Sequence, residues 1–490
     1  MTEDTTKTVP AAAEPSDNIV TTRHTITLKG KALKYTATVG TVVLKEEVDK
    51  EGHKAKAEIF FMAFTRDGVR NPAKRPLTFS FNGGPGSSSV WMLLGLLGPR
   101  RVPLAKNENE RLAPPFELTD NEFTLLEESD LVFIDPVGTG YSRPVSGENT
   151  DPNEFYSFQR DLDSVGEFIR LYTSRHQRWA SPKFLIGESY GTTRAAGLSG
   201  LLQERHGLYL NGIMLVSVVL NFQTILFNEG NDLPFIVYLP SYALTAWYHR
   251  KLPEKYLKMD IDAFIAEVSA FAEGDYNLAL MKGSRLGGAE RAAVVKQLAV
   301  YTGLSEDYIN GSNLRIPIMR FVKELLRKES KHVGRFDSRI TGTDKDDTGE
   351  NFERDPSFDI VQGVYSGCLN DFVRRELNYA SDLPYEILSF KVMPKWKYDS
   401  FQNSYVNTAE TLRTAMMKNP HLKVFVANGL YDLATPFFAT QYTIEHLGLR
   451  DGREANIEMG YYAAGHMMYV NTKALTELSA DLKRFVKRSA

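Results

Sequence analysis

The sequence predicts an α/β fold with a mixed, mostly parallel central sheet, flanking helices and a large inserted cap domain. Short apolar runs alternate with helical segments over residues 76–220, which indicates parallel strands covered by helices on both faces. This alternation stops over residues 221–395, where aromatic clusters, short helical stretches and a polar segment occur instead. Because that interval is too long for a crossover between two strands, we interpret it as an insertion.

Composition restricts the classes of function. The 490 residues are 42% hydrophobic and 24% charged, with a net charge of −3, as is typical of a soluble globular protein. Nothing in this charge indicates binding to nucleic acid or to an anionic membrane surface. The longest apolar run, residues 212–220, has the length of a strand and not of a transmembrane helix. We therefore expect no nucleic-acid or membrane partner, and the oligomeric state stays open.

The N-terminal segment gives a prediction of location. Residues 1–17 are polar and rich in Thr, Pro and Ala, and we expect a disordered tail. They lack the basic start and apolar stretch of a signal peptide. The chain is therefore expected to be soluble and cytoplasmic, although export of a longer precursor remains open.

The strands are predicted from short apolar or alternating runs. Residues 22–65 alternate between apolar and polar side chains with turn signals between the runs, as in antiparallel strands at the edge of a mixed sheet. A helix is predicted from residue 158, where apolar side chains recur at steps of four and three. Further strands are expected at residues 76–81, 130–135, 183–186, 212–220, 423–427 and 457–461, and a last helix closes the chain.

The pentapeptide Gly-Glu-Ser-Tyr-Gly at residues 187–191 follows a strand-like run and precedes a helical segment. A strand, G-x-S-x-G and a helix make the nucleophile elbow of the α/β-hydrolases. The tight turn would expose the hydroxyl of Ser189, and the glycines permit close approach of the strand and helix backbones. On this interpretation residues 18–220 and 396–490 form an α/β-hydrolase catalytic domain, and residues 221–395 form its cap.

Two further residues complete a catalytic triad with Ser189. Asp432 and His466 each follow a predicted strand, at the sheet edge where Ser189 also emerges and where open α/β sheets bind ligands. The order Ser, Asp, His is that of the α/β-hydrolases. His466 would act as the base toward Ser189, and Asp432 would orient the imidazole and stabilise its charge. The alternative for His466 is a surface-loop histidine.

An oxyanion hole is predicted at the same edge of the sheet. The N–H of the residue after the nucleophile, Tyr190, is one donor, and the other comes from a loop after an earlier strand. Residues 82–89 form such a glycine-rich loop, in which Gly84 is the natural candidate. A plain strand–helix turn is the alternative. A phosphate-binding loop is disfavoured because the Gly-Lys-Ser/Thr ending is absent.

Cys368 is the single cysteine, so this sequence cannot form an intrachain disulfide and its fold does not depend on an oxidising compartment. A catalytic thiol is the alternative to a small packed residue, which we favour. No CxxC or HExxH motif occurs, and neither a metal nor a cofactor is expected.

Several blocks of sequence together resemble the serine carboxypeptidases, and they occur in the order of that family. The predicted cap also falls where the family has its insertion. Because Ser87 stands in place of a family cysteine and the family's disulfides are absent, the chain resembles a bacterial-type member. The blocks are residues 82–86, 187–191, 428–436 and 465–467, and residues 135–142 are also similar to the family.

The resemblance implies hydrolysis of the C-terminal peptide bond of peptides through an acyl-enzyme on Ser189, so that peptides with a free C-terminus are the expected partners. It also implies that the Asn82 side chain, the Gly83 N–H and Glu188 hold the substrate carboxylate. A backbone N–H and an amide can bind a carboxylate, and a protonated Glu188 can donate a further hydrogen bond. The acidic partner of this glutamate in the family corresponds to Leu96, so no pair of carboxylic acids is expected.

Two other functions remain open. An esterase or acyltransferase would use the same triad without needing a free substrate carboxylate. A non-catalytic binding module would keep only the fold, and the complete set of Ser189, Asp432 and His466 argues against it. The side-chain preferences at the substrate pockets are not predicted, because those pockets lie in the cap.

Overall fold

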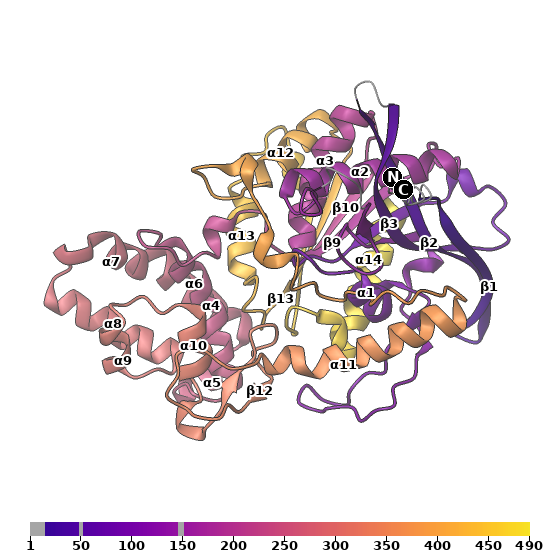
Figure 1. Ribbon diagram of the computed structural model, residues 1–490. Helices are drawn as coiled ribbons and strands as arrows, with labels where there is room; N and C mark the ends of the chain where they lie inside the picture. Colours follow the sequence, from indigo (N-terminus) through magenta and orange to yellow (C-terminus); the bar gives the residue numbers. More distant parts are fainter. Residues whose placement is uncertain (1–14, 49–51, 146–150) are drawn as a thin grey trace, which may run out of the picture.

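The computed structural model describes residues 15–48, 52–145 and 151–490. Within them a central sheet of ten strands is flanked by helices (Figure 1). The predicted α/β-hydrolase fold with a mixed, mostly parallel sheet is confirmed. Nine strands lie in the order β1 (Asn18–Leu28), β2 (Lys31–Val48), β3 (Gly52–Arg66), β7 (Asp130–Ile134), β4 (Leu77–Phe81), β9 (Lys183–Ser189), β10 (Gly212–Val218), β13 (Lys423–Gly429) and β14 (Ile457–Tyr462), and β8 (Arg143–Pro144) pairs with β3.

The direction of pairing changes once across the sheet. Strands β1, β2 and β3 pair antiparallel, as predicted from their alternation, and β3 is also antiparallel to β7. From β7 onward the strands pair in parallel through β4, β9, β10 and β13 to β14. The carboxyl ends of β4, β9, β13 and β14 therefore meet at one edge, where α/β sheets bind their ligands.

Successive side chains of a strand enter two different cores, one on each face of the sheet. Figure 1 shows the helices of the second core above the sheet and α11 of the first core below it. A closing helix, α14, was predicted and also belongs to the first core. The first core includes α1 (Val90–Met92), α11 (Pro356–Asp371) and α14 (Thr472–Ser489), and the second includes α2 (Phe158–Arg175), α3 (Tyr190–His206) and α12 (Ala409–Lys418).

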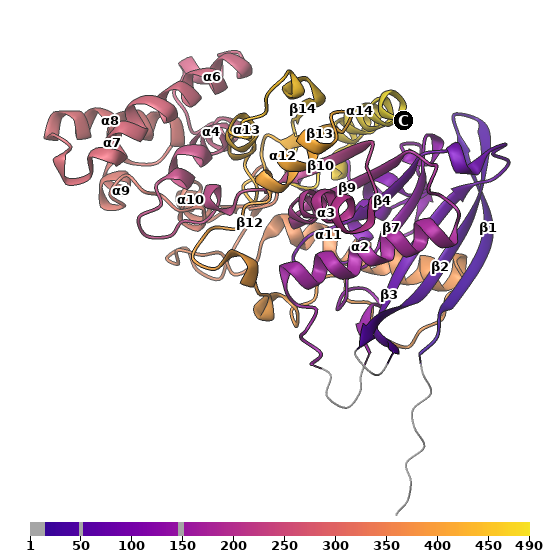
Figure 2. The ribbon, with the colours of Figure 1, turned by 90° about the horizontal axis from the view of Figure 1, so that it is seen from above.

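A group of helices projects from one side of the molecule (Figure 2), and its hydrophobic core also includes Tyr431, Leu433 and Phe437 from the segment after β13. The helices lie inside the predicted cap, residues 221–395, but α11 of the same range packs in the first core of the main sheet. The proposed domain boundaries stay predictions. The cap elements are α4 (Leu233–Tyr248), α5 (Glu254–Leu257), α6 (Ile261–Phe271), α7 (Asn277–Lys282), α8 (Gly288–Thr302), α9 (Glu306–Gly311), α10 (Ile318–Glu324), β11 (His332–Val333) and β12 (Thr341–Gly342).

Residues 1–14 of the predicted tail lie outside the described residues. Asp17, within the predicted tail, accepts a hydrogen bond from the Val43 N–H at 2.9 Å and pairs with Arg175 at 2.6 Å. Among the described residues no helix combines the length and the apolar character needed to cross a membrane. Helix α13 (Phe437–Glu445) lies between β13 and β14 in the sequence, and β5 (Arg100–Arg101) and β6 (Thr119–Asp120) form a separate two-stranded sheet.

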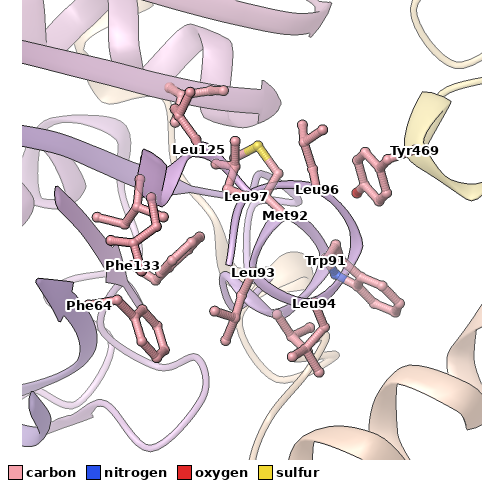
Figure 3. Close-up of a cluster of buried hydrophobic side chains, with 14 of the residues drawn as sticks. Phe64, Trp91, Met92, Leu93, Leu94, Leu96, Leu97, Leu125, Phe133 and Tyr469 are labelled. Atoms are coloured by element: carbon pink, nitrogen blue, oxygen red, sulfur yellow. The ribbon is translucent and has the colours of Figure 1, made fainter. Parts of the chain in front are cut away.

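A buried π-helical turn, residues 93–97, follows α1 and packs beside the segment after His466 (Figure 3). Gly95 lies in this turn, and a Cβ there would come within 2.3 Å of the ring of Tyr469 and 2.5 Å of the hydroxyl of Tyr365. Glycine at position 95 is therefore needed for both tyrosines to approach the turn.

The reactivity of the Cys368 thiol can be used to test the packing of α11. The thiol is buried in the first core, and burial, followed by the charge of Asp371, raises its pKa to about 11. At pH 7 only about one thiol in ten thousand would be ionised, and the thiolate is the reactive form. We expect iodoacetamide to label the folded protein very slowly and the urea-unfolded protein fully, as measured by mass spectrometry. Rapid labelling of the folded protein would contradict this packing.

Candidate active site

Ser189 lies at the sharp turn between β9 and α3. It is the last residue of the strand, and its backbone angles, φ 59° and ψ −129°, fall where L-residues are rare. A Cβ on Gly187 would lie 2.1 Å from the carbonyl oxygen of Gly191, so only glycine permits this turn. The strained turn leaves the Ser189 side chain partly exposed, as the nucleophile elbow predicts.

The Asp432 carboxylate is fully buried, and both of its oxygens are hydrogen-bonded. Its Oδ1 accepts from the N–H groups of Ala434 at 2.7 Å and Thr435 at 3.0 Å. Its Oδ2 accepts from the Thr435 hydroxyl at 2.7 Å and lies 2.7 Å from His466 Nδ1. A proton on Nδ1 that donates to Asp432 leaves Nε2 of His466 as the acceptor.

The imidazole of His466 is held in place and electrostatically tuned. Burial lowers its pKa, but the charge of Asp432 and the hydrogen bond to it prevail, so the pKa is raised above the ordinary value. The Ser217 hydroxyl donates to the His466 carbonyl oxygen at 2.6 Å. Among the described residues no hydrogen bond joins Ser189 to His466, although both line one cavity. Such contacts are often long before substrate binds.

A segment of the predicted cap, residues 335–338, runs between the loops that carry Asp432 and His466. Three backbone hydrogen bonds join it to them, so the insertion contributes directly to the alignment of the candidate triad. Nothing in the sequence of this segment predicts that role. The bonds are Leu433 N–H to Arg335 O at 3.0 Å, His466 N–H to Phe336 O at 2.6 Å and Ser338 N–H to Tyr431 O at 3.0 Å.

The two predicted oxyanion donors come from the loop after β4 and the start of α3. Tyr190 is the first residue of α3, and Gly84 is exposed with φ 103°. Within the described residues neither backbone N–H donates a hydrogen bond. A Cβ on Gly83 would lie 2.5 Å from the Tyr190 nitrogen, so the loop and the helix start are in close contact. The loop that carries Gly84 and the Tyr190 N–H therefore lie side by side at this edge of the sheet.

Glu188, the residue before Ser189, is buried in a network of uncharged partners. Its Oε2 accepts from Asn82 Nδ2 at 3.1 Å and from the Tyr469 hydroxyl at 2.6 Å. The other end of the Asn82 amide accepts from the Met92 N–H at 3.2 Å, which fixes the amide with its NH₂ toward Glu188. Asn82 and Glu188 thus act as one preorganised polar unit.

This environment changes the protonation of Glu188. Burial raises its pKa to about 7, against the opposing effects of the His466 charge and of the hydrogen bonds from Tyr469 and Asn82. Below this pH the side chain is mostly a neutral acid. Because Oε2 already accepts two hydrogen bonds, the proton belongs on Oε1, which has no partner within the described residues. The protonated Oε1 then has a hydrogen-bond donor that none of these contacts uses, on a side chain that lines the cavity.

Tyr469 is another residue of the site that the sequence did not predict. It follows His466 by three positions in a short 3-10 turn and is fully buried. Figure 3 shows it beside the turn that carries Leu96. Leu96 is itself buried, and its correspondence with the family's acidic residue stays a prediction. The phenol of Tyr469 donates the shorter of the two hydrogen bonds to Glu188 Oε2, at 2.6 Å.

A cavity of about 190 Å³ brings these groups together. Within the described residues no group of three or more His, Cys, Asp or Glu side chains is placed to hold a metal ion. The predicted site residues meet at one place, and their individual roles stay predictions. The cavity is lined by Asn82, Gly83, Gly84, Ser87, Trp91, Glu188, Ser189, Arg335, Phe336, Phe358, Leu388, Met393, His466 and Met467.

Comparison with protein families finds a match to the family model described as serine carboxypeptidase, over residues 48–254. The matched segment, less than half of the chain, contains the nucleophile elbow, the glycine-rich loop and Glu188. Asp432 and His466 lie beyond it. The resemblance drawn from the sequence motifs is thus confirmed for this segment.

Two curated relatives each match less than a third of the chain. Serine carboxypeptidase-like 5 of Arabidopsis thaliana is 28% identical over 141 residues, which are 28% of this chain and 30% of the relative. The pheromone-processing carboxypeptidase KEX1 of Saccharomyces cerevisiae is 32% identical over 159 residues, 31% of this chain and 20% of the relative. The alignments therefore span less than a third of these relatives' length.

Among solved structures, the prohormone-processing carboxypeptidase KEX1(delta)p from Saccharomyces cerevisiae superposes with a TM-score of 0.55. The sequence identity is 17%, and the superposition covers 92% of this chain and 91% of that one. At this identity the likeness establishes the common α/β-hydrolase fold over nearly the whole chain, including the parts that the family model does not match.

A buried arginine supports the floor of the site. Arg194 of α3 is fully buried; its Nε donates to Asp161 at 2.8 Å and its Nη1 to the Asn82 carbonyl oxygen at 2.6 Å. The guanidinium also lies 5.4 Å from the ring centroid of Phe81 and 5.2 Å from that of Tyr190. It therefore ties the end of β4 to the start of α3.

Removing one member of the Arg194–Asp161 ion pair should lower the stability of the protein. We expect Arg194→Met to leave a buried, unpaired Asp161 and to lower the free energy of unfolding by about 3–5 kcal/mol, as measured by urea denaturation. The double variant Arg194→Met/Asp161→Leu removes both charges and should recover a large part of the loss. A single variant as stable as wild type, or a double variant no better than the single one, would show that the pair does not brace the site.

Proposed function

We propose that this protein is a serine carboxypeptidase that removes the C-terminal residue of peptides through an acyl-enzyme on Ser189. The observation that carries the proposal is a buried, uncharged carboxylate-binding unit, Asn82 and Glu188, in the same cavity as Ser189 and His466. An esterase needs only the nucleophile and base. A unit that recognises a free carboxylate beside them favours an exopeptidase.

In the proposed mechanism His466 Nε2 accepts the Ser189 proton while Ser189 Oγ attacks the scissile carbonyl carbon. The developing oxyanion accepts hydrogen bonds from the N–H groups of Gly84 and Tyr190. His466 then gives its proton to the leaving amine, and the peptide C–N bond breaks. Water, deprotonated by His466, attacks the acyl-enzyme and releases Ser189. Asp432 stabilises the imidazolium in both stages.

The substrate's terminal carboxylate would be held on the leaving-group side. Its hydrogen-bond donors are the second N–H of the Asn82 amide, the Gly83 N–H and the proton on Glu188 Oε1. A protonated Glu188 donates to this carboxylate, whereas an ionised Glu188 repels it. Peptides with a free C-terminus are therefore the proposed substrates.

The lone cysteine supports a family member without intrachain disulfides, of the bacterial type. The relatives compared above come from a plant and a yeast, so that type is part of the proposal. A cytoplasmic location also remains a prediction from the sequence alone.

The function is tested with blocked dipeptides. We expect benzyloxycarbonyl-Phe-Leu to be cleaved and its C-terminal amide to be cleaved far more slowly, measured by chromatography of released leucine or leucinamide. Ser189→Ala should lower turnover by about 10⁴ to 10⁶ without changing the melting temperature, because the hydroxyl takes no part in the core. Equal cleavage of acid and amide would favour the esterase or acyltransferase alternative, and a variant with a tenth of wild-type activity would exclude Ser189 as nucleophile.

The pH dependence follows from Glu188. Its pKa is raised to about 7, so it donates to the substrate carboxylate below that pH and repels it above. We expect KM for the blocked dipeptide to rise with pH above about 7, while kcat falls on the acid side as His466 becomes protonated. Measurement of both constants across the pH range separates the two groups.

Two variants serve as controls for this pH profile. Glu188→Gln keeps an N–H donor that cannot ionise and should flatten the rise in KM. Tyr469→Phe removes a hydrogen bond that lowers the Glu188 pKa, so its KM should begin to rise at a higher pH than in wild type. Identical KM profiles for wild type and Glu188→Gln would mean that Glu188 does not contact the carboxylate.

A further inference from the structure

The cavity of the candidate site would surround the C-terminal residue of a peptide substrate, which is the leaving residue of the proposed reaction. Under the proposed function, His466 gives its proton to the amine of the leaving residue, and Asn82, Gly83 and Glu188 hold that residue's carboxylate. The leaving residue is thus fixed at both ends within this cavity. Its side chain must meet the remaining lining groups, which are mainly apolar and include Trp91, Phe336, Phe358 and Met467, with one cation, Arg335.

The backbone of Arg335 is rigidly placed beside the triad. Its N–H donates to both carboxylate oxygens of Asp355 at 3.3 Å, and its carbonyl oxygen accepts from the Leu433 N–H at 3.0 Å. The next residue, Phe336, accepts from the His466 N–H at 2.6 Å and packs its ring 5.0 Å from the imidazole. Arg335 is therefore held at the wall of the cavity independently of its own side chain.

The guanidinium of Arg335 has no ion-pair or hydrogen-bond partner among the described residues. Its recorded side-chain contact is with the face of the Phe336 ring, 5.2 Å from the centroid. By contrast, Arg339, four residues further along the chain, pairs with Asp337 at 2.6 Å and with Glu108 at 3.1 Å. A half-buried, unpaired arginine on the wall of a substrate cavity is available to an anionic ligand group.

We propose that Arg335 makes this site selective for leaving residues with an acidic side chain. The inference rests on the proposed function and adds the class of substrate to it. The ionisable groups that line the cavity are Arg335, Glu188 and His466. Glu188 and His466 are committed to the carboxylate and the amine of the leaving residue. Arg335 remains to bind a glutamate or aspartate side chain bidentately and to repel lysine or arginine.

The test compares blocked dipeptides that differ only in the leaving residue: benzyloxycarbonyl-Phe-Glu, -Phe-Gln, -Phe-Leu and -Phe-Lys. We expect kcat/KM of the wild type to favour Glu over Gln by about tenfold or more, with Lys the poorest. Arg335→Gln should bring the Glu and Gln values together, so that the Glu-to-Gln ratio measured within this one variant falls to about one. Arg335→Lys should keep part of the preference. Arg320→Gln, which removes a cap arginine paired with Glu350 outside the cavity, should change none of the ratios.

Binding measurements separate this proposal from the proposed function. The Ser189→Ala protein should bind the Glu dipeptide more tightly than the Gln dipeptide by calorimetry, whatever the turnover of the wild type. Equal affinities, or a Glu-to-Gln ratio unchanged in Arg335→Gln, would overturn the selectivity. A uniform loss on all four substrates in Arg335→Gln would overturn it too, because Arg335 would then contact the terminal carboxylate and not the side chain.

Discussion

The candidate site depends on the close contact between the backbone after β4 and the backbone at the start of α3. A Cβ on Gly83 would lie 2.5 Å from the Tyr190 nitrogen, and one on Gly191 would lie 2.8 Å from the Phe81 carbonyl oxygen. Side chains at these positions would separate the two segments. Their contact places Gly84, the turn at Ser189 and the Asn82–Glu188 unit around one cavity. The hydrogen bond from Arg194 of α3 to the Asn82 carbonyl oxygen also joins the two segments.

A second constraint is the burial of the Glu188 carboxyl group, whose hydrogen-bond donors are the uncharged side chains of Asn82 and Tyr469. Burial makes the ionised form of Glu188 unfavourable, so its pKa is raised. The Tyr469 phenol, three residues after His466, donates the shortest of these hydrogen bonds. His466 and the Asn82–Glu188 unit are therefore linked through one loop, and the charges of His466 and Glu188 each affect the pKa of the other.

The sequence predicted the fold and the residues that meet at the cavity because their signals are local. Ser189 ends a strand, Asp432 and His466 each follow one, and parallel strands bring their carboxyl ends to one edge. Tyr469, Arg335 and Phe336 could not be predicted in this way, because their contacts join segments more than a hundred residues apart or pass through the insertion. The packing of α11 against the main sheet was missed for the same reason.

The central claim is that Glu188 is a neutral acid whose proton faces the substrate cavity. Infrared difference spectroscopy of protein labelled with ¹³C-glutamate, wild type against Glu188→Gln, observes that proton directly. We expect a carboxylic-acid C=O band that belongs to Glu188 and disappears with a midpoint near pH 7, because burial raises the pKa of Glu188 to about 7. The band should shift when a carboxylate-bearing product binds. A Glu188 that shows only carboxylate bands well below that pH would contradict the account.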